Sequence, residues 1–413
     1  MTGQGDGVGQ QVAVRSLAQR IGTVFTDTDW DRLGHVAIEE VPLPPAEGAE
    51  SIWGAVGSDD RGHVWFAVSG ADAHLYEWDP ASHSVIARGD AAGALAEAGR
   101  QRQGEQQGKI HSHLQQADDG YLYFTSMDDN FEDWRTDTTP RWGSHLWRIR
   151  PESGHWEHVF AAPEGLVALN AAGRWVYALG YWNNVLYQYD TLTARVNKQV
   201  VGTACGHVSR NFVVDQHGHV YVPRLEPLSA DPDASCRPEG YRAVLVELDT
   251  RLREVSTQPL EGYLSGEAPA ADHGIIAFAK MADGTIAFTT HSGRLYHVIA
   301  FADAPALVMS LGDLHPAGPA YTASLFSVDG KGLIAGVSLP RSGGTGEAEW
   351  LRYQLHSGRA AVAPLATPAH RAILLYGSMA RDANGDFFTG GRIQEPSGRI
   401  RPVLFRIRLE PGS

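Results

Sequence analysis

The sequence has little cysteine, no excess of positive charge and no long apolar run. Two cysteines in 413 residues, Cys205 and Cys236, are too few for a disulfide framework, so we expect two inert thiols. The formal net charge of −14 opposes a nucleic-acid partner, which would favour a basic face. No apolar run approaches the ~20 residues that cross a bilayer, and residues 1–14 lack the basic and apolar regions of a signal peptide. These absences predict a monomer with no nucleic-acid or membrane partner, cytoplasmic as the sequence stands, or secreted if a leader was removed.

Seven copies of one β-rich unit fill most of the chain. Each copy has a tight turn with glycine, which supplies the positive φ of a hairpin, between two alternating apolar stretches. The turn glycines are Gly62, Gly120, Gly173, Gly218, Gly284, Gly332 and Gly385. The third strands of the copies begin near His74, His145, Val185, Val244, Arg294, Trp350 and Val403. A period of roughly 40–50 residues is typical of propeller blades. The sequence therefore predicts an all-β, seven-bladed β-propeller rather than a β-solenoid or two β-sandwiches.

The domain organisation follows from this repeat. We expect one propeller domain over residues 1–413, with an N-terminal extension at 1–34 and blades from about 51 to 410. The stretch HVAIEEVPL at 35–43 is a strand without a partner of its own, and pairing it with the last blade would close the ring and cover two exposed edges. The only helix we expect is short and starts at Ala91, between blades one and two.

Candidate site residues follow from propeller geometry. The loops that precede first strands and those between second and third strands open on one face, so their residues converge on the channel mouth. The residues at these positions are His111, His113, His207, Arg210, Lys280, Tyr376, His145, Tyr181, Arg224, His291, Arg341 and Arg392. This set is rich in His, Arg and Tyr and almost free of Asp and Glu. It predicts a basic, aromatic pocket on an acidic body, suited to an anionic sugar or another carboxylate ligand.

Other kinds of site have weaker support. Hard divalent metals prefer carboxylate and amide oxygens, which these positions lack, so we expect no catalytic metal, although a structural Ca²⁺ in the channel is compatible with the fold. Cys205, His207 and His219 suit zinc by type, but His219 begins a second strand at the opposite end of its hairpin. The chain has no G-x-S-x-G nucleophile motif.

Two stretches carry a resemblance to a known group. QGKIHSHLQQADDGYLYFTS (Gln107 to Ser126) and GHVSRNFVVDQHGHVYVPR (Gly206 to Arg224) resemble the seven-bladed propeller lyases that include ulvan lyases and rhamnosyl-glucuronate lyases. The architecture agrees over nearly the whole chain, whereas the specific motifs cover blades two to four. The resemblance implies β-elimination at a glucuronate or iduronate by two His, one Tyr and Arg.

The resemblance also implies roles for particular residues. The matching catalytic residues are His113 (with His111 as a register alternative), His145, Tyr181 (with Tyr187 and Tyr189 left open) and Arg210. We expect substrate contacts from His111, Arg224, His291, Tyr376 and Arg392. A long insertion from Met127 to Gly143, called the blade-two insertion below, is expected to wall one side of the cleft and to change which sugars fit.

The chemistry explains why these residue types belong together. Elimination removes the C5 proton beside a carboxylate, so Arg must neutralise that carboxylate while a base takes the proton and an acid protonates the leaving O4. The sequence thus predicts a metal-independent lyase, with no required cofactor, that cleaves the bond to O4 of a rhamnose-linked uronic acid in a poly- or oligosaccharide. The alternatives are a non-catalytic propeller that binds carbohydrate or protein, and a lactonase-like hydrolase.

Overall fold

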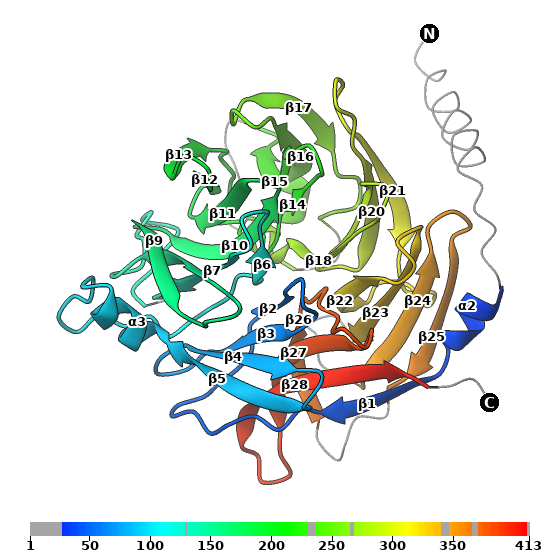
Figure 1. Ribbon diagram of the computed structural model, residues 1–413. Coiled ribbons are helices and arrows are strands. Elements are labelled where there is room, and N and C mark those ends of the chain that lie inside the picture. Colours follow the sequence, from blue (N-terminus) through cyan, green and yellow to red (C-terminus); the bar gives the residue numbers. More distant parts are fainter. Residues whose placement is uncertain are drawn as a thin grey trace.

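The structure is a seven-bladed β-propeller, which confirms the predicted fold class. This computed structural model describes residues 27–128, 130–229, 236–264, 268–339, 347–365 and 371–410, without the side chains of 371–373. Seven four-stranded antiparallel sheets surround a central axis, with first strands such as β18 and β22 near the axis and fourth strands such as β5, β13 and β17 at the rim (Figure 1).

The first four blades follow chain order. Blade one contains β2 (Val56–Ser58), β3 (Val64–Val68), β4 (His74–Asp79) and β5 (Ser84–Asp90). Blade two contains β6 (Gln115–Gln116), β7 (Leu122–Met127), β8 (Ser144–Ile149) and β9 (Trp156–Ala162). Blade three contains β10 (Gly165–Ala172), β11 (Trp175–Tyr181), β12 (Val185–Asp190) and β13 (Arg195–Val200). Blade four contains β14 (Val213–Val214), β15 (Val220–Pro227), β16 (Tyr241–Leu248) and β17 (Glu254–Pro259).

The last three blades complete the ring. Blade five contains β18 (Ile275–Lys280), β19 (Ile286–Thr290), β20 (Arg294–Ile299) and β21 (Leu307–Asp313). Blade six contains β22 (Tyr321–Ser327), β23 (Leu333–Leu339), β24 (Glu349–Gln354) and β25 (Arg359–Pro364). Blade seven contains β26 (Arg371–Tyr376), β27 (Phe387–Gln394), β28 (Ile400–Leu409) and, on its outer edge, β1 (Val36–Glu40).

Blade seven is built from both ends of the described chain. β1 pairs antiparallel with β28, from Val36 opposite Leu409 to Glu40 opposite Phe405, and the two strands lie side by side in Figure 1. Ion pairs reinforce this seam, since Arg406 Nη1 lies 2.8 Å from a carboxylate oxygen of Glu39. The pairing leaves β28 without an exposed edge.

A recurrent aspartate explains the tight turns between first and second strands. Asp59 Oδ1 accepts hydrogen bonds from the backbone N–H groups of Arg61 and His63, two and four residues later. Asp382 makes the same pair of bonds. Gly62, inside the first of these turns, has φ +75°, a conformation that glycine adopts without steric cost. The Asp-x-x-Gly pattern is therefore hairpin chemistry.

The core lies between neighbouring blades. Trp147 and Trp156 of blade two pack edge-to-face, 5.4 Å between ring centroids, in a cluster that also contains Trp65 and Leu75 of blade one. Trp350 of blade six packs on Phe387 of blade seven at 5.2 Å. Large aromatic side chains at these interfaces stabilise the ring through area burial and ring-edge contacts.

Four short helical segments accompany the blades in the described part of the chain. They are α2 (Asp27–Arg32), α3 (Ala91–Glu97), η1 (Pro238–Gly240) and η2 (Ala270–Asp272). The sequence predicts α3 but not α2, which lies within the predicted N-terminal extension, and Leu33 beside it accepts a 2.8 Å hydrogen bond from the Trp350 indole. Within the described residues, every helix is too short or too polar to cross a membrane.

Candidate functional site

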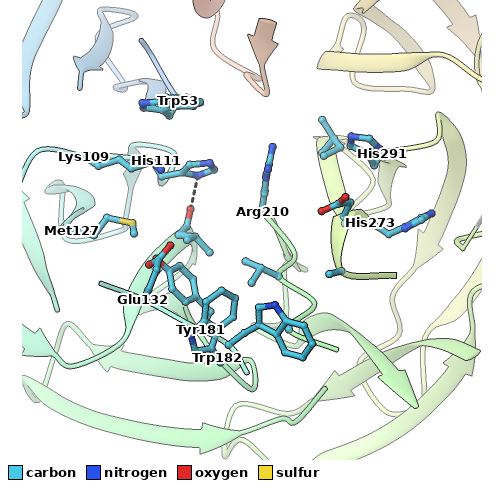
Figure 2. Close-up of a pocket in the computed structure, with 18 residues that line it drawn as sticks. Trp53, Lys109, His111, Met127, Glu132, Tyr181, Trp182, Arg210, His273 and His291 are labelled. Atoms are coloured by element: carbon cyan, nitrogen blue, oxygen red, sulfur yellow. Dashed lines mark hydrogen bonds between the residues drawn. The ribbon is translucent and has the colours of Figure 1, made fainter. Parts of the chain in front are cut away.

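A cavity of about 330 Å³ opens at the channel mouth, and we call it the mouth cavity. Its labelled lining residues in Figure 2 are Trp53, Lys109, His111, Met127, Glu132, Tyr181, Trp182, Arg210, His273 and His291. A narrow inner extension continues from it, lined by His113, Asn211, Tyr321 and Tyr376 as well as shared residues. Nine residues were predicted as catalytic or substrate-contacting, and six of them line these two spaces. The six are His111, His113, Tyr181, Arg210, His291 and Tyr376.

Arg210 stands where the two spaces meet (Figure 2). Its side chain is exposed, and its guanidinium makes no hydrogen bond or ion pair with any described residue. Its charge lowers the pKa values of four side chains from blades two, five, six and seven, relative to burial alone. These side chains are His111, His291, Tyr321 and Tyr376. An unpaired guanidinium inside such a ring can bind a carboxylate in a bidentate manner.

The loop that carries Arg210 is fixed by its neighbours. The buried Asn211 side chain donates a 2.6 Å hydrogen bond to the Ile276 carbonyl of blade five, and Ser209 Oγ accepts from the Ile275 amide at 3.0 Å. The backbone of this loop is thereby held between blades four and five. The Arg210 guanidinium itself has no hydrogen-bond or ion-pair partner among the described residues.

His111 is presented to the mouth cavity as a neutral base. Its Nδ1 lies 2.9 Å from the Val167 carbonyl, which can only accept, so Nδ1 carries the proton and Nε2 keeps a lone pair. Burial, and then the charges of Lys109 and Arg210, lower the pKa of His111 well below its usual value. These conditions suit a proton acceptor at neutral pH.

His113 lies deeper than His111. It is 3% exposed, and burial lowers its pKa to about 4 despite the Val56 carbonyl and the Asn211 side chain, which favour the charged form. The structure therefore distinguishes the two histidines that the sequence left as alternatives for one catalytic position. His111 lines both spaces, whereas His113 lines the inner extension alone.

Trp53 forms an aromatic wall that the sequence analysis missed. Its ring lies 4.8 Å from that of Tyr376, with Lys109 Nζ 4.9 Å and the Arg392 guanidinium 5.1 Å from its centroid. Arg392 thus contacts Trp53 but lines neither space itself. The prediction that Arg392 contacts the substrate directly is therefore corrected. Burial raises the pKa of Tyr376 and keeps its hydroxyl protonated.

The blade-two insertion does wall one side of the mouth cavity, through Glu132 and Trp134. The Tyr181 hydroxyl donates to the Glu132 carboxylate, and Asp272 also lines the cavity, so the mouth contains acids in addition to the predicted set, which was almost free of Asp and Glu. Tyr187 lies elsewhere and donates a 2.6 Å hydrogen bond to Glu164. Of the three tyrosines left open by the sequence, Tyr181 is the one that lines the cavity.

Two histidines of blade five form the wall beyond Arg210. The ring centroids of His273 and His291 lie 6.5 Å apart, and His273 Nδ1 donates to the Pro269 carbonyl at 3.0 Å. Burial and the Arg210 charge lower the pKa of His291. His273 was not among the predicted residues, although it precedes a first strand as His111 does.

His145 does not belong to the site, in contrast to its expected catalytic role. Its Nε2 lies 3.0 Å from Glu105 and its Nδ1 2.9 Å from His158 Nε2, and the ring is 3% exposed. Burial raises the pKa of Glu105, but bonds from Arg102 and His145 outweigh this and lower it to about 2. The start of β8 points His145 into a buried polar network between blade two and the segment after α3.

Arg224 and Lys280 also lie outside the mouth. Arg224 is held by two carboxylates, Glu226 at 2.8 Å and Glu254 at 2.9 Å. Lys280 ends β18 at the other end of the channel, where it donates to Asn170 Oδ1 at 2.8 Å. Arg341 falls outside the described residues.

The two cysteines form a disulfide, which overturns the expectation of inert thiols. Cys205 lies five residues before Arg210, and the Cys236 carbonyl accepts a 3.0 Å hydrogen bond from Ala270, beside Asp272 and His273. The disulfide therefore ties the segment of Arg210 to Cys236, and the carbonyl of Cys236 in turn holds the segment of His273. It also removes Cys205 as a zinc ligand.

Another group of potential metal ligands lies in the hairpin of blade one. Asp59, His63 and Glu77 place their ligand atoms within 4.8 Å of one another. Arg61 Nη2 lies 2.6 Å from Asp59, and Arg88 Nη2 lies 2.5 Å from Glu77, so guanidinium groups already neutralise both carboxylates. We interpret this cluster as a structural ion network.

The missed residue Trp53 has a recognisable signal in the repeat. It precedes its turn glycine, Gly62, by nine residues (62 − 53). His111 and Tyr376 precede Gly120 and Gly385 by the same number (120 − 111 and 385 − 376). Counting nine residues back from the turn glycine therefore finds mouth residues in blades one, two and seven.

Comparisons with known proteins place the fold only. No protein-family model and no curated protein matches the chain. A solved ulvan lyase, described as a new family of polysaccharide lyase and bound to -[GlcA(1-4)Rha3S]-, is similar with a TM-score of 0.51 and 11% identity, covering 89% of this chain and 94% of that one. A chain of the mitotic checkpoint complex has a TM-score of 0.50 and 11% identity, covering 90% and 91%.

A third solved structure is also similar, with a lower score. The β-propeller domain of the trilobed protease from Pyrococcus furiosus has a TM-score of 0.48 and 9% identity, covering 89% of this chain and 95% of that one. The chain is thus a seven-bladed β-propeller whose structural neighbours have varied roles.

Proposed function

We propose that the protein is a lyase that cleaves an acidic poly- or oligosaccharide at the bond to O4 of a uronic acid, by β-elimination without a metal. The observation that carries the proposal is the unpaired Arg210 guanidinium, surrounded by imidazole and phenol groups in a cavity of about 330 Å³. The likeness to an ulvan lyase bound to -[GlcA(1-4)Rha3S]- supports a rhamnose-linked glucuronate or iduronate as the substrate.

Arg210 supplies the first requirement of the reaction. An ionised carboxylate resists further negative charge on C5, and a bidentate guanidinium offsets this resistance as the charge develops. Because Arg210 has no partner among the described residues, binding the substrate breaks no existing ion pair. Lys109 is the nearest second cation on the His111 side of the cavity.

His111 and Tyr181 supply the proton transfers. The C5–H bond breaks as His111 Nε2 takes the proton, and the electron pair is held on C5 and the carboxylate beside Arg210. This pair forms the C4–C5 double bond as the C4–O4 bond breaks, and the leaving oxygen takes a proton from the Tyr181 hydroxyl, which Glu132 orients. His111 of blade two and Tyr181 of blade three thus act on C5 and O4 of a sugar whose carboxylate is held by Arg210 of blade four.

Product absorbance tests the proposal. Incubation with glucuronate-containing polysaccharides, ulvan among them, should produce a rise in ultraviolet absorbance from the C4–C5 double bond, unchanged by a chelator. Binding without this rise would leave a non-catalytic carbohydrate-binding propeller. New reducing ends without the rise would indicate a hydrolase.

A further inference from the structure

A second cavity of about 300 Å³ lies beside the mouth cavity, and we call it the side cavity. It shares Trp134, Trp182 and Gly206 with the mouth cavity, so two indole rings stand at the boundary between them. Each cavity lies near the lower end of the ~300–1,000 Å³ range of ligand sites. A ligand that filled both would extend beyond the group held by Arg210.

The blade-two insertion builds the outer wall of the side cavity and is fixed to blade three. The Trp182 indole N–H donates to the Thr138 carbonyl at 3.1 Å, and Asn183 Nδ2 donates to Asp137 at 3.4 Å. Trp134 packs directly on Gly206, where φ is +61° and any side chain would collide with the ring. These contacts hold the wall in place without ligand.

The side cavity contains one prominent cation. Arg135 is exposed and lies over the Trp134 ring, 5.1 Å from its centroid. Its guanidinium makes no hydrogen bond or ion pair with any residue in the described part of the chain. Asn183 and Thr203 add polar groups to the same wall. Indole faces and a free guanidinium together suit a pyranose ring that carries an anionic substituent.

We propose that the side cavity binds a second sugar ring of the same chain, next to the uronate, with a sulfate or carboxylate group directed to Arg135. This inference rests on the proposed function and extends it, since it makes longer anionic oligosaccharides the preferred ligands. The shared Trp134 and Trp182 would contact the glycosidic link between the two rings.

Calorimetric titration with two ligand lengths tests the proposal. A His111→Gln background prevents cleavage, and the probes are the methyl glycoside of a single uronate and the matching sulfated tetrasaccharide. Arg135→Ala should weaken tetrasaccharide binding about tenfold, the effect of losing one charge-assisted hydrogen bond, and leave monosaccharide binding within twofold. Arg141→Ala is the matched control, because Arg141 lies in the same insertion, stacks on Trp142 at 4.6 Å and lines neither cavity.

The outcomes separate this inference from the function on which it rests. Unchanged tetrasaccharide affinity in Arg135→Ala, or an equal loss for both lengths, would overturn the side-cavity assignment and leave the lyase proposal standing. Failure of either ligand to bind the unsubstituted protein would overturn both. An Asn183→Ala variant with intact thermal stability provides a second probe of the same wall, and we expect a smaller loss for the tetrasaccharide alone.

Discussion

Replacing Arg210 by glutamine should remove most of the activity and leave the fold unchanged. A carboxylate about 4 Å from the guanidinium, at an effective dielectric constant of ~20, interacts by about 4 kcal/mol. Because the side chain is exposed, solvent screening reduces this value, and we expect about 3 kcal/mol in the transition state, a loss of roughly a hundredfold in kcat/KM. Stability should stay within about 0.5 kcal/mol, since no described residue pairs with Arg210.

The pH profile gives a second readout for the same variant. The Arg210 charge contributes to the lowered pKa of His111, so removing it should raise that pKa and move the acid limb of kcat/KM to higher pH. The assay is initial-rate absorbance on a uronate polysaccharide across pH, with Arg224→Gln as control because its ion pairs lie outside the mouth. A rate within twofold of the unsubstituted protein, or an unshifted acid limb, would refute the assignment of Arg210 and His111.

Three further predictions follow from the buried polar groups and the disulfide. His145→Gln should keep kcat/KM within twofold but lower the free energy of unfolding by about 1–3 kcal/mol, because it disturbs the Glu105 network; a hundredfold loss of activity at unchanged stability would contradict the geometry. Burial lowers the pKa of His113 to about 4 and that of His207 to about 3. Below pH 6.5 these two histidines therefore bind protons in the unfolded chain but not in the folded chain. Stability should therefore fall by roughly 3 kcal/mol for each residue between pH 6.5 and pH 4, measured by denaturant titration, and His113→Gln should flatten the profile. Reduction of Cys205–Cys236 should raise KM more than it lowers kcat, because the bond ties the segment of Arg210 to Cys236, whose carbonyl holds the segment of His273. Thiol titration before reduction should find no free cysteine.

The blade count and most strand positions could be predicted because each rests on local signals. The predicted third strands at His74, Val185 and Arg294 coincide with the starts of β4, β12 and β20. Turn glycines and apolar alternation act within a hairpin, so their meaning does not depend on distant partners. Propeller geometry then brings together His111 and Arg210, which lie 99 residues apart (210 − 111).

The errors at the site come from contacts that the repeat does not encode. His145 has the position of a mouth residue, but Glu105, from an irregular segment, binds it inside blade two. Arg224 is likewise engaged by Glu254, two strands away in the same sheet. Carboxylate partners of this kind are set by side-chain direction and loop path. Sequence spacing gives neither. The small number of cysteines likewise led to an expectation of two inert thiols, where the structure has a disulfide.

The seam in blade seven sets the order in which the site becomes complete during synthesis. Trp53 and Tyr376 touch across this junction, 4.8 Å between ring centroids, although one belongs to blade one and the other to the last blade. A nascent chain can fold its early blades as they leave the ribosome, but β1 must wait for β28, made more than 350 residues later (400 − 40). Arg210 therefore gains its full aromatic surroundings only after blade seven has been translated.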